Sequence, residues 1–119
     1  MRRTLATIAF ILAGSLPGMT HAAEIDCAQE GAIRSKSGDV GTALTFRVVG
    51  ENDETQFKLY WLDYDGNRKF YRHVFAGDTY RQDTYLTHPW LVTAPEPGGG
   101  EPCVMIVLPD REPRRITLD

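Results

Sequence analysis

Short runs of β-forming residues alternate with turn signals about every ten residues, and no segment keeps a long helical period. Apolar side chains occupy every second position of residues 44–48, and residues 57–61 repeat the alternation. This pattern is typical of strands with one buried face, and the spacing of the runs is typical of a β-sandwich or small barrel. The polar segment at residues 50–55 lies between the two runs, so they are predicted to form a hairpin.

The tripeptide Asp65-Gly66-Asn67 is the strongest turn signal, because Gly and Asn adopt positive φ angles at low cost. It predicts a following strand over about residues 69–75. Further strands are predicted from composition and turn signals, together with an exposed loop and one short helical turn before Arg34. The strands are residues 79–85, 90–93, 103–108 and 114–118, and the loop is residues 94–102. The total is about seven strands.

Residues 1–22 have the pattern of an export signal peptide. Arg2 and Arg3 precede an apolar run from Leu5 to Leu16, and small residues follow. The run is about a dozen residues long, whereas a membrane-spanning helix needs about 20. We therefore predict cleavage after Ala22, no membrane anchor, and a periplasmic or secreted domain of residues 23–119.

The charge of this domain limits its partners. The signal peptide carries two of the 13 Lys and Arg and none of the 16 Asp and Glu, so the remainder carries 11 basic and 16 acidic residues, a net charge of −5. An acidic chain without a stripe of basic residues is a poor binder of nucleic acids or anionic membranes. Neither kind of partner is expected.

Two cysteines, Cys27 and Cys103, remain after the predicted cleavage. An even number of cysteines in an oxidising compartment favours a disulfide. Two unpaired buried thiols are the alternative. A metal site is disfavoured because the only histidines left, His73 and His88, are not spaced with the cysteines as zinc ligands are. No metal and no cofactor is predicted.

The large aromatic residues have an ordinary explanation, because small β domains build their cores from such side chains. Trp61 has the strand parity of buried neighbours, so burial is expected, and Trp90 can be core in the same way. Tyr71 shares a predicted strand face with Lys69 and His73, which favours an exposed or half-exposed ring. Each ring alone is therefore no argument for a binding site.

The polar candidates also have ordinary explanations. Thr84 can be a solvent-facing strand threonine, and His88 can be a turn or capping residue. A catalytic arrangement of Thr84, His88 and Asp83 has almost no support, since the chain contains no G-x-S-x-G motif and its paired carboxylates lie in turns. An enzyme is not expected.

The joint spacing of these residues is more specific than any one of them. Trp61 is followed after ten positions by Tyr71, after thirteen more by Thr84, after four by His88 and after two by Trp90. Residues 61–66 (WLDYDG) and 88–91 (HPWL) are similar to the strings W-L-N-F-D-G and H-L-W-L of the von Hippel-Lindau β domain. The resemblance runs from about Ile33 to Leu118.

This resemblance implies an all-β fold, a seven-stranded antiparallel β-sandwich, and a pocket for hydroxyproline. It implies that Trp61, Tyr71 and Trp90 wall a slot for the proline ring, and that Thr84 and His88 hydrogen-bond its hydroxyl. The expected ligand is a protein or peptide with hydroxyproline or rich in proline. The family usually has serine where Thr84 stands, so the added methyl group narrows the expected slot.

The family's helical domain, which recruits a ubiquitin ligase through an elongin partner, has no counterpart before the last residue, Asp119. Elongin binding and ubiquitin-ligase activity are therefore not expected. The alternative to a hydroxyproline pocket is a structural or protein-interaction β-sandwich. Such a domain would use its edge strands or the loop at residues 94–102, with the aromatic cluster serving as core.

Overall fold

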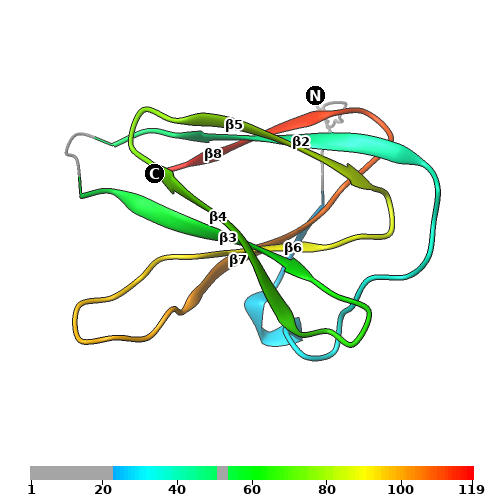
Figure 1. The fold of residues 1–119 in the computed structure, drawn as a ribbon, viewed down its shortest axis with the longest axis horizontal. Helices are drawn as coiled ribbons and strands as arrows, with labels where there is room; N and C mark the ends of the chain where they lie inside the picture. The colour runs from blue at the N-terminus through cyan, green and yellow to red at the C-terminus, as the bar shows by residue number, and fades with distance from the viewer. Residues whose placement is uncertain (1–22, 51–53) are drawn as a thin grey trace, which may run out of the picture.

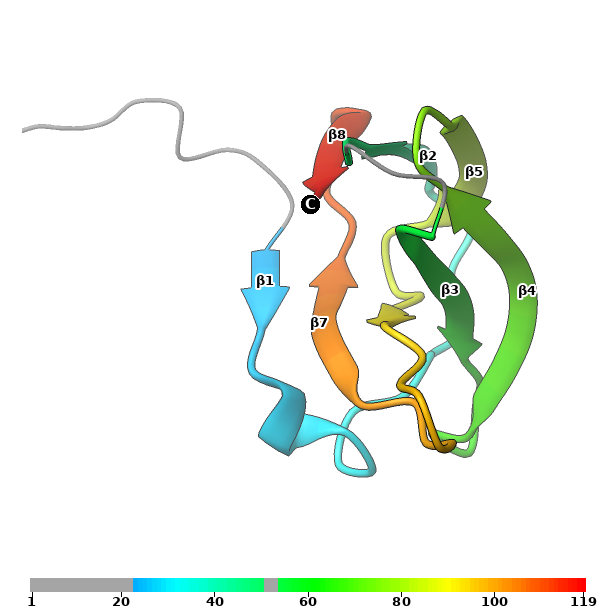
Figure 2. The same ribbon diagram turned by 90° about the vertical axis from the view of Figure 1, so that its left-hand side faces the viewer.

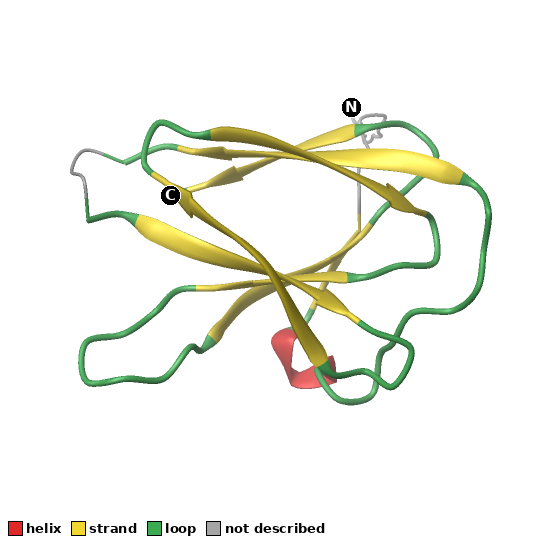
Figure 3. Ribbon diagram, in the orientation of Figure 1, coloured by secondary structure: helices red, strands yellow, loops and turns green. Residues whose placement is uncertain are grey.

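The computed structural model describes residues 23–50 and 54–119, and the predicted signal peptide, residues 1–22, lies outside the described residues. Two β-sheets pack face to face (Figure 1, Figure 3). The elements are β1 (Ala23–Ile25), a 3-10 helix η3 (Cys27–Gln29), β2 (Gly41–Val48), β3 (Gln56–Leu62), β4 (Arg68–Phe75), β5 (Thr79–Tyr85), β6 (Trp90–Thr93), β7 (Cys103–Leu108) and β8 (Arg114–Leu118). No helix in this part of the chain is long and apolar enough to cross a membrane.

The larger sheet has the order β1-β7-β6-β3-β4 and the smaller one the order β5-β2-β8. Figure 2 shows β1 beside β7 at the edge of the larger sheet, and the three-stranded sheet above the larger sheet. The predicted all-β sandwich is confirmed, with eight described strands in place of about seven. The additional strand is β1, and β2 and β8 form a parallel pair in an otherwise antiparallel fold.

The predicted hairpin of residues 44–49 with residues 57–62 is wrong. β2 pairs with β5 and β8, whereas β3 pairs with β4 and β6 in the other sheet. The two runs alternate as predicted, but their apolar faces meet across the sandwich. Alternation shows which face of a strand is buried, and it does not show which strand is its neighbour.

The main core lies between the sheets. β2 supplies Leu44, Phe46 and Val48, each no more than 1% exposed, and β3 supplies Phe57 and Leu59. The other buried members of this cluster are Val74, Trp90, Val92, Val107 and Leu118. The strand periodicity read from the sequence therefore identifies these five core positions of β2 and β3 correctly.

A second, smaller core lies on the outer face of the larger sheet. Leu62, Leu91 and Ile106 are fully buried there, and Ile25 and Ile33 of the N-terminal segment pack against them. All four residues of β6 are buried as a result. The segment from β1 to residue 33 thus covers an apolar sheet face that water would otherwise reach.

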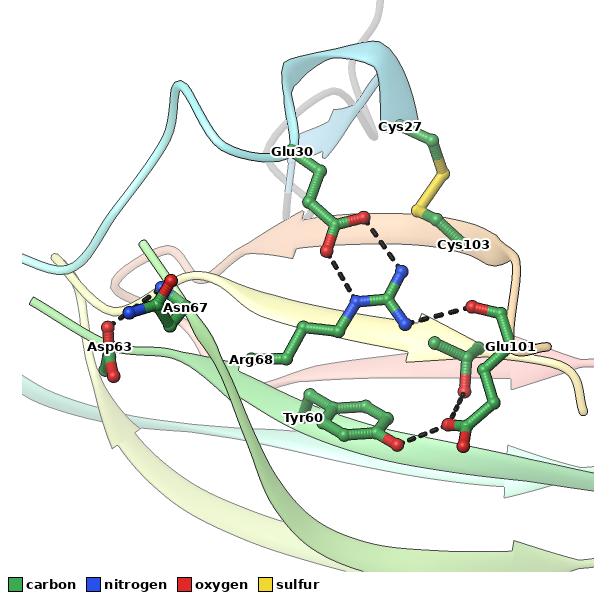
Figure 4. A network of polar contacts seen from close by, with 9 residues as sticks. Cys27, Glu30, Tyr60, Asp63, Asn67, Arg68, Glu101 and Cys103 are labelled. Carbon is green, nitrogen blue, oxygen red and sulfur yellow. Dashed lines mark hydrogen bonds and ion pairs between the residues drawn. A yellow bond between two sulfur atoms is a disulfide. The ribbon is translucent and has the colours of Figure 1, made fainter. Parts of the chain in front are cut away.

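The N-terminal segment is held to this face by a disulfide and by a polar network (Figure 4). Cys27 and Cys103 form the predicted disulfide, which closes a loop of 76 positions. Glu30 accepts a hydrogen bond of 2.9 Å from Nη2 of Arg68, whose Nη1 donates to the Glu101 carbonyl oxygen at 2.9 Å. The Arg68 hydrogen bond holds the pKa of Glu30 below its usual range.

The same network extends to β3. Tyr60 donates a hydrogen bond to the Glu101 carboxylate, and Lys58 forms an ion pair with it at 2.9 Å. Burial, and then the Glu101 hydrogen bond, raise the pKa of Tyr60 to about 12. The predicted loop at residues 94–102 is thereby fastened at its C-terminal end, although its tip is exposed.

Reducing the disulfide should destabilise the domain. Because the bond closes a long loop, the chain-entropy model gives about 4 kcal/mol of stabilisation for it. We expect urea unfolding of the wild type to shift to lower denaturant when a reductant is added. The double variant Cys27→Ser/Cys103→Ser should unfold at the shifted midpoint whether or not reductant is present. Equal midpoints for all samples would contradict the prediction.

Candidate functional site

A β-bulge in the edge strand β4 determines which side chains reach the interior. In the register of β3 with β4, Leu59 pairs with Arg72 and Tyr60 pairs with Phe70, so Tyr71 has no partner. An unpaired residue of this kind bends the strand and redirects its side chains. The alternation of faces along β4 therefore changes at Tyr71.

The bulge places Tyr71 on the inner side, where its ring meets the ring of Trp90 edge-on with centroids 4.7 Å apart. The prediction that Tyr71 shares a face with His73 is therefore wrong, because His73 contacts Phe70 and Phe75 on the outer side. The predicted partial exposure of Tyr71 is confirmed, since 45% of the residue is accessible. Its ring lies at the open end of the core.

Trp90 and Thr84 join the two sheets at this end. Nε1 of Trp90 in β6 donates a hydrogen bond of 2.8 Å to Oγ1 of Thr84 in β5. Trp90 is 2% exposed and Thr84 6%, so the alternative of a solvent-facing Thr84 is wrong. The bond uses one acceptor position of the Thr84 hydroxyl, whose own proton is left for another partner.

His88 lies in the turn between β5 and β6, where its backbone N–H donates to the Tyr85 carbonyl oxygen at 3.1 Å. Its ring centroid is 5.3 Å from that of Trp61, and Nε2 lies 3.3 Å from the Tyr64 hydroxyl. Burial lowers the pKa of His88 below 6.5, although a hydrogen bond with the Lys36 backbone acts in the opposite direction. The imidazole is therefore neutral at pH 7.

Trp61 is partly buried, whereas the strand parity predicts a core side chain. Its ring packs against the main core and lies 5.3 Å, centroid to centroid, from Tyr64 as well as from His88. Among the described residues, its Nε1 has no hydrogen-bond partner although the atom is buried. An unmet buried donor costs about 1 to 3 kcal/mol.

All five predicted residues line one concavity of about 150 Å³: Trp61, Tyr71, Thr84, His88 and Trp90. Sequence reasoning did not assign Gln82, Asp83 and Tyr85 to the pocket, but these three residues also line it. Gln82 has the strand parity of Thr84, a signal from which it could have been identified. A drug-sized ligand usually occupies about 300 to 1,000 Å³, whereas an apolar cavity of about 150 Å³ holds a single benzene-sized ring.

The rings around His88 form a contiguous aromatic wall. Tyr64 and Tyr85 meet the imidazole edge-on with centroid distances of 5.6 and 5.3 Å. Tyr64 belongs to the string WLDYDG, in which Oδ1 of Asp63 accepts hydrogen bonds from the backbone of Asp65 and Asn67, both at 2.9 Å. Gly66 completes this turn with a φ of 84°. The turn signal and the aromatic wall are thus parts of one local structure.

The concavity combines aromatic walls with two polar groups, Thr84 and His88. Among the described residues, no group of three or more His, Cys, Asp or Glu side chains is placed to hold a metal ion. Thr84 offers a hydroxyl proton, and neutral His88 offers a ring nitrogen that can accept one. The chemistry available is recognition of a small ring with a polar substituent.

A family model described as the VHL beta domain matches residues 34–98, which is more than half of the chain. The match contains all five predicted residues of the concavity and both strings, WLDYDG and HPWL. Among curated proteins, none matches the chain.

The titration of His88 should make stability depend on pH. Its pKa is lower in the folded protein than the ordinary 6.5, so the unfolded chain binds more protons between the two values. The stability that His88 contributes by remaining neutral is complete above pH 6.5. It is lost as the pH falls through the pKa of His88 in the folded protein. Urea midpoints should therefore decrease from pH 7.5 to about pH 5 in the wild type and decrease less in His88→Gln.

The carboxylates of Glu30 and Glu101 do not interfere in this range, because their hydrogen bonds lower both pKa values below 4.5. Equal pH dependence of the wild type and His88→Gln would show that His88 is not responsible.

Proposed function

Since the chain belongs to the VHL β-domain family, we propose that it is a binding module for peptides that contain hydroxyproline or are rich in proline. The observation that carries the proposal is the single concavity lined by Trp61, Tyr71, Thr84, His88 and Trp90. The binding of protein or peptide ligands is the role that the family suggests. Ligase activity and elongin binding are no part of the proposal.

The two polar groups suit a hydroxyl. Oγ1 of Thr84 already accepts a hydrogen bond from Trp90, so its proton is directed to another acceptor. In the proposed complex it donates to the ligand hydroxyl oxygen. The ligand hydroxyl in turn donates to the neutral His88 ring, taking the place of Tyr64 at Nε2. The ligand hydroxyl then accepts one hydrogen bond, from Thr84, and donates one, to His88.

The aromatic walls suit a pyrrolidine ring. Tyr71 and Trp90 meet at nearly a right angle, 84° between the ring planes, and Trp61 lies beside His88. A proline ring is rigid before it binds, so little conformational entropy is lost when it packs against these faces. The volume of about 150 Å³ is sufficient for one such ring and too small for a larger cofactor.

The position of β4 supports an extended ligand. β4 is the last strand of the larger sheet, so its outer backbone groups are not paired within the described sheet. Tyr71 places the concavity directly at this edge. A peptide that inserts its proline ring can add main-chain hydrogen bonds along β4, as in other cases of strand addition.

We also propose that the protein is exported and acts in the periplasm or outside the cell. The disulfide between Cys27 and Cys103 supports this, because such bonds persist in oxidising compartments. The ligands would then be extracellular chains that carry hydroxyproline, such as collagen-like proteins or plant wall glycoproteins.

Calorimetric titration with two peptides that differ only in the proline hydroxyl tests the proposal. The hydroxylated peptide should bind more tightly, because plain proline leaves the proton of the buried Thr84 hydroxyl without an acceptor. The expected cost is about 1 to 3 kcal/mol, or roughly five- to hundredfold in Kd. Thr84→Val keeps the shape of the side chain and removes its hydroxyl, so it should abolish the preference. Thr84→Ser should retain it.

Thr117→Val makes the same chemical change on an exposed strand position and serves as the matched control. It should bind both peptides as the wild type does. Equal Kd values for the two peptides with the wild type, or no binding of either, would refute the hydroxyproline proposal. Tighter binding by Thr84→Ser than by the wild type would indicate that the threonine methyl narrows the slot.

A second candidate function is a protein-interaction domain that uses the outer face of β4. The bulge gathers Phe70, His73 and Phe75 there, and Phe70 and Phe75 are 50% and 44% exposed. Under this alternative, a partner would perturb the NMR resonances of these three residues and leave those of the concavity unchanged. The hydroxyproline proposal predicts the reverse pattern for a hydroxylated peptide.

A further inference from the structure

A second and larger concavity adjoins the first. It has a volume of about 580 Å³ and is lined by Gly41, Thr42, Arg81, Asp83, Thr84, Tyr85, Arg111 and Pro113. Three of these residues, Asp83, Thr84 and Tyr85, also line the smaller concavity. The end of β5 is thus a shared border between the slot and this second site, which we call the arginine groove.

The groove is basic although the protein is acidic. Its lining carries two arginines and one carboxylate, whereas acidic residues outnumber basic ones in the chain by 16 to 13. The carboxylate of Asp83 pairs with Arg81 at 3.0 Å, but their side chains are 84% and 62% exposed. An ion pair so exposed contributes little and exchanges readily with another carboxylate. Arg81 is therefore available to a ligand.

Arg111 lines the groove from the turn between β7 and β8. The carbonyl oxygen of Asp110, in the turn after β7, accepts a hydrogen bond of 2.8 Å from the Thr42 hydroxyl. Its carboxylate accepts one from the Glu112 backbone, also at 2.8 Å, and faces Arg114 at 3.5 Å. Asp110 is thus occupied within the turn. In the described part of the chain, the Arg111 side chain has no ion-pair partner.

Gly41 keeps the floor of the groove open. It lies opposite Tyr85 in the register of β2 with β5. A Cβ atom at this position would meet only the Thr84 carbonyl oxygen, at 4.0 Å. Gly41 is also not among the glycines with positive φ, so a larger residue fits its backbone. A substitution there would fill the groove without straining the strand.

From these observations, and resting on the proposed function, we infer that the arginine groove binds an acidic side chain close to the proline of the peptide ligand. Both arginines would pair with its carboxylate while the proline ring occupies the slot. The two sites share a border, and an extended chain advances about 3.3 Å per residue. The acidic residue therefore lies within a few residues of the proline.

The test uses hydroxyproline peptides in which one glutamate is moved through the three positions on either side, each with a matched glutamine peptide. At one or two positions, glutamate should lower the Kd, by about two- to fivefold for each arginine contact. The gain should decrease at high salt. Arg81→Gln and Arg111→Gln should each reduce it, and Gly41→Val should remove it. None of these variants should alter the ratio between hydroxyproline and proline peptides.

Arg34→Gln is the matched control, because Arg34 lines a separate concavity with Ile33 and Leu86. It should keep the full gain from glutamate. If the protein prefers hydroxyproline to proline but glutamate lowers the Kd at no position, the groove inference is overturned and the proposed function remains intact. Loss of the gain in Arg34→Gln as strongly as in Arg111→Gln would also overturn it. Absence of all peptide binding would overturn both.

Discussion

The hydrogen bond between Trp90 and Thr84 is the contact on which the site depends. It crosses from the larger sheet to the smaller one, both partners are buried, and its 2.8 Å length leaves no room for water between them. It fixes the orientation of the indole wall and of the hydroxyl together. The site is therefore continuous with the core, because Trp90 forms one of its walls and is itself a core residue. A change at Thr84 alters packing and recognition at the same time.

Two further constraints maintain that geometry. The bulge at Tyr71 turns its ring inward to Trp90 and leaves Phe70 on the outer face. Nearby, Cζ of Arg72 in β4 lies 4.4 Å from the ring centroid of Tyr80 in β5. This contact joins the edge strands of the two sheets. On the opposite face, the N-terminal segment is fastened by the disulfide and by Glu30 with Arg68. The larger sheet is thus supported on both of its faces.

Local signals in the sequence predicted local structure well. The alternation at residues 44–48 identified the buried positions of β2, and the Asp65-Gly66-Asn67 turn is present as predicted. Pairing was predicted less well, because the partner of a strand depends on contacts that are distant in the chain. The proposed hairpin of β2 with β3 failed for that reason. β1 was missed because three residues are too few to show a period.

The sequence by itself determined the fold class, the disulfide partners and the set of five residues that resembles a known pocket. The tertiary structure decided how those residues meet. The bulge, which periodicity does not show, moved Tyr71 to the inner side. The contact between the two sheets gave Thr84 its buried hydrogen bond, and the turn after β7 brought Arg111 into the lining of the arginine groove. A sequence specifies which side chains are available, whereas the distances between them follow from long-range pairing and packing, which no local pattern encodes.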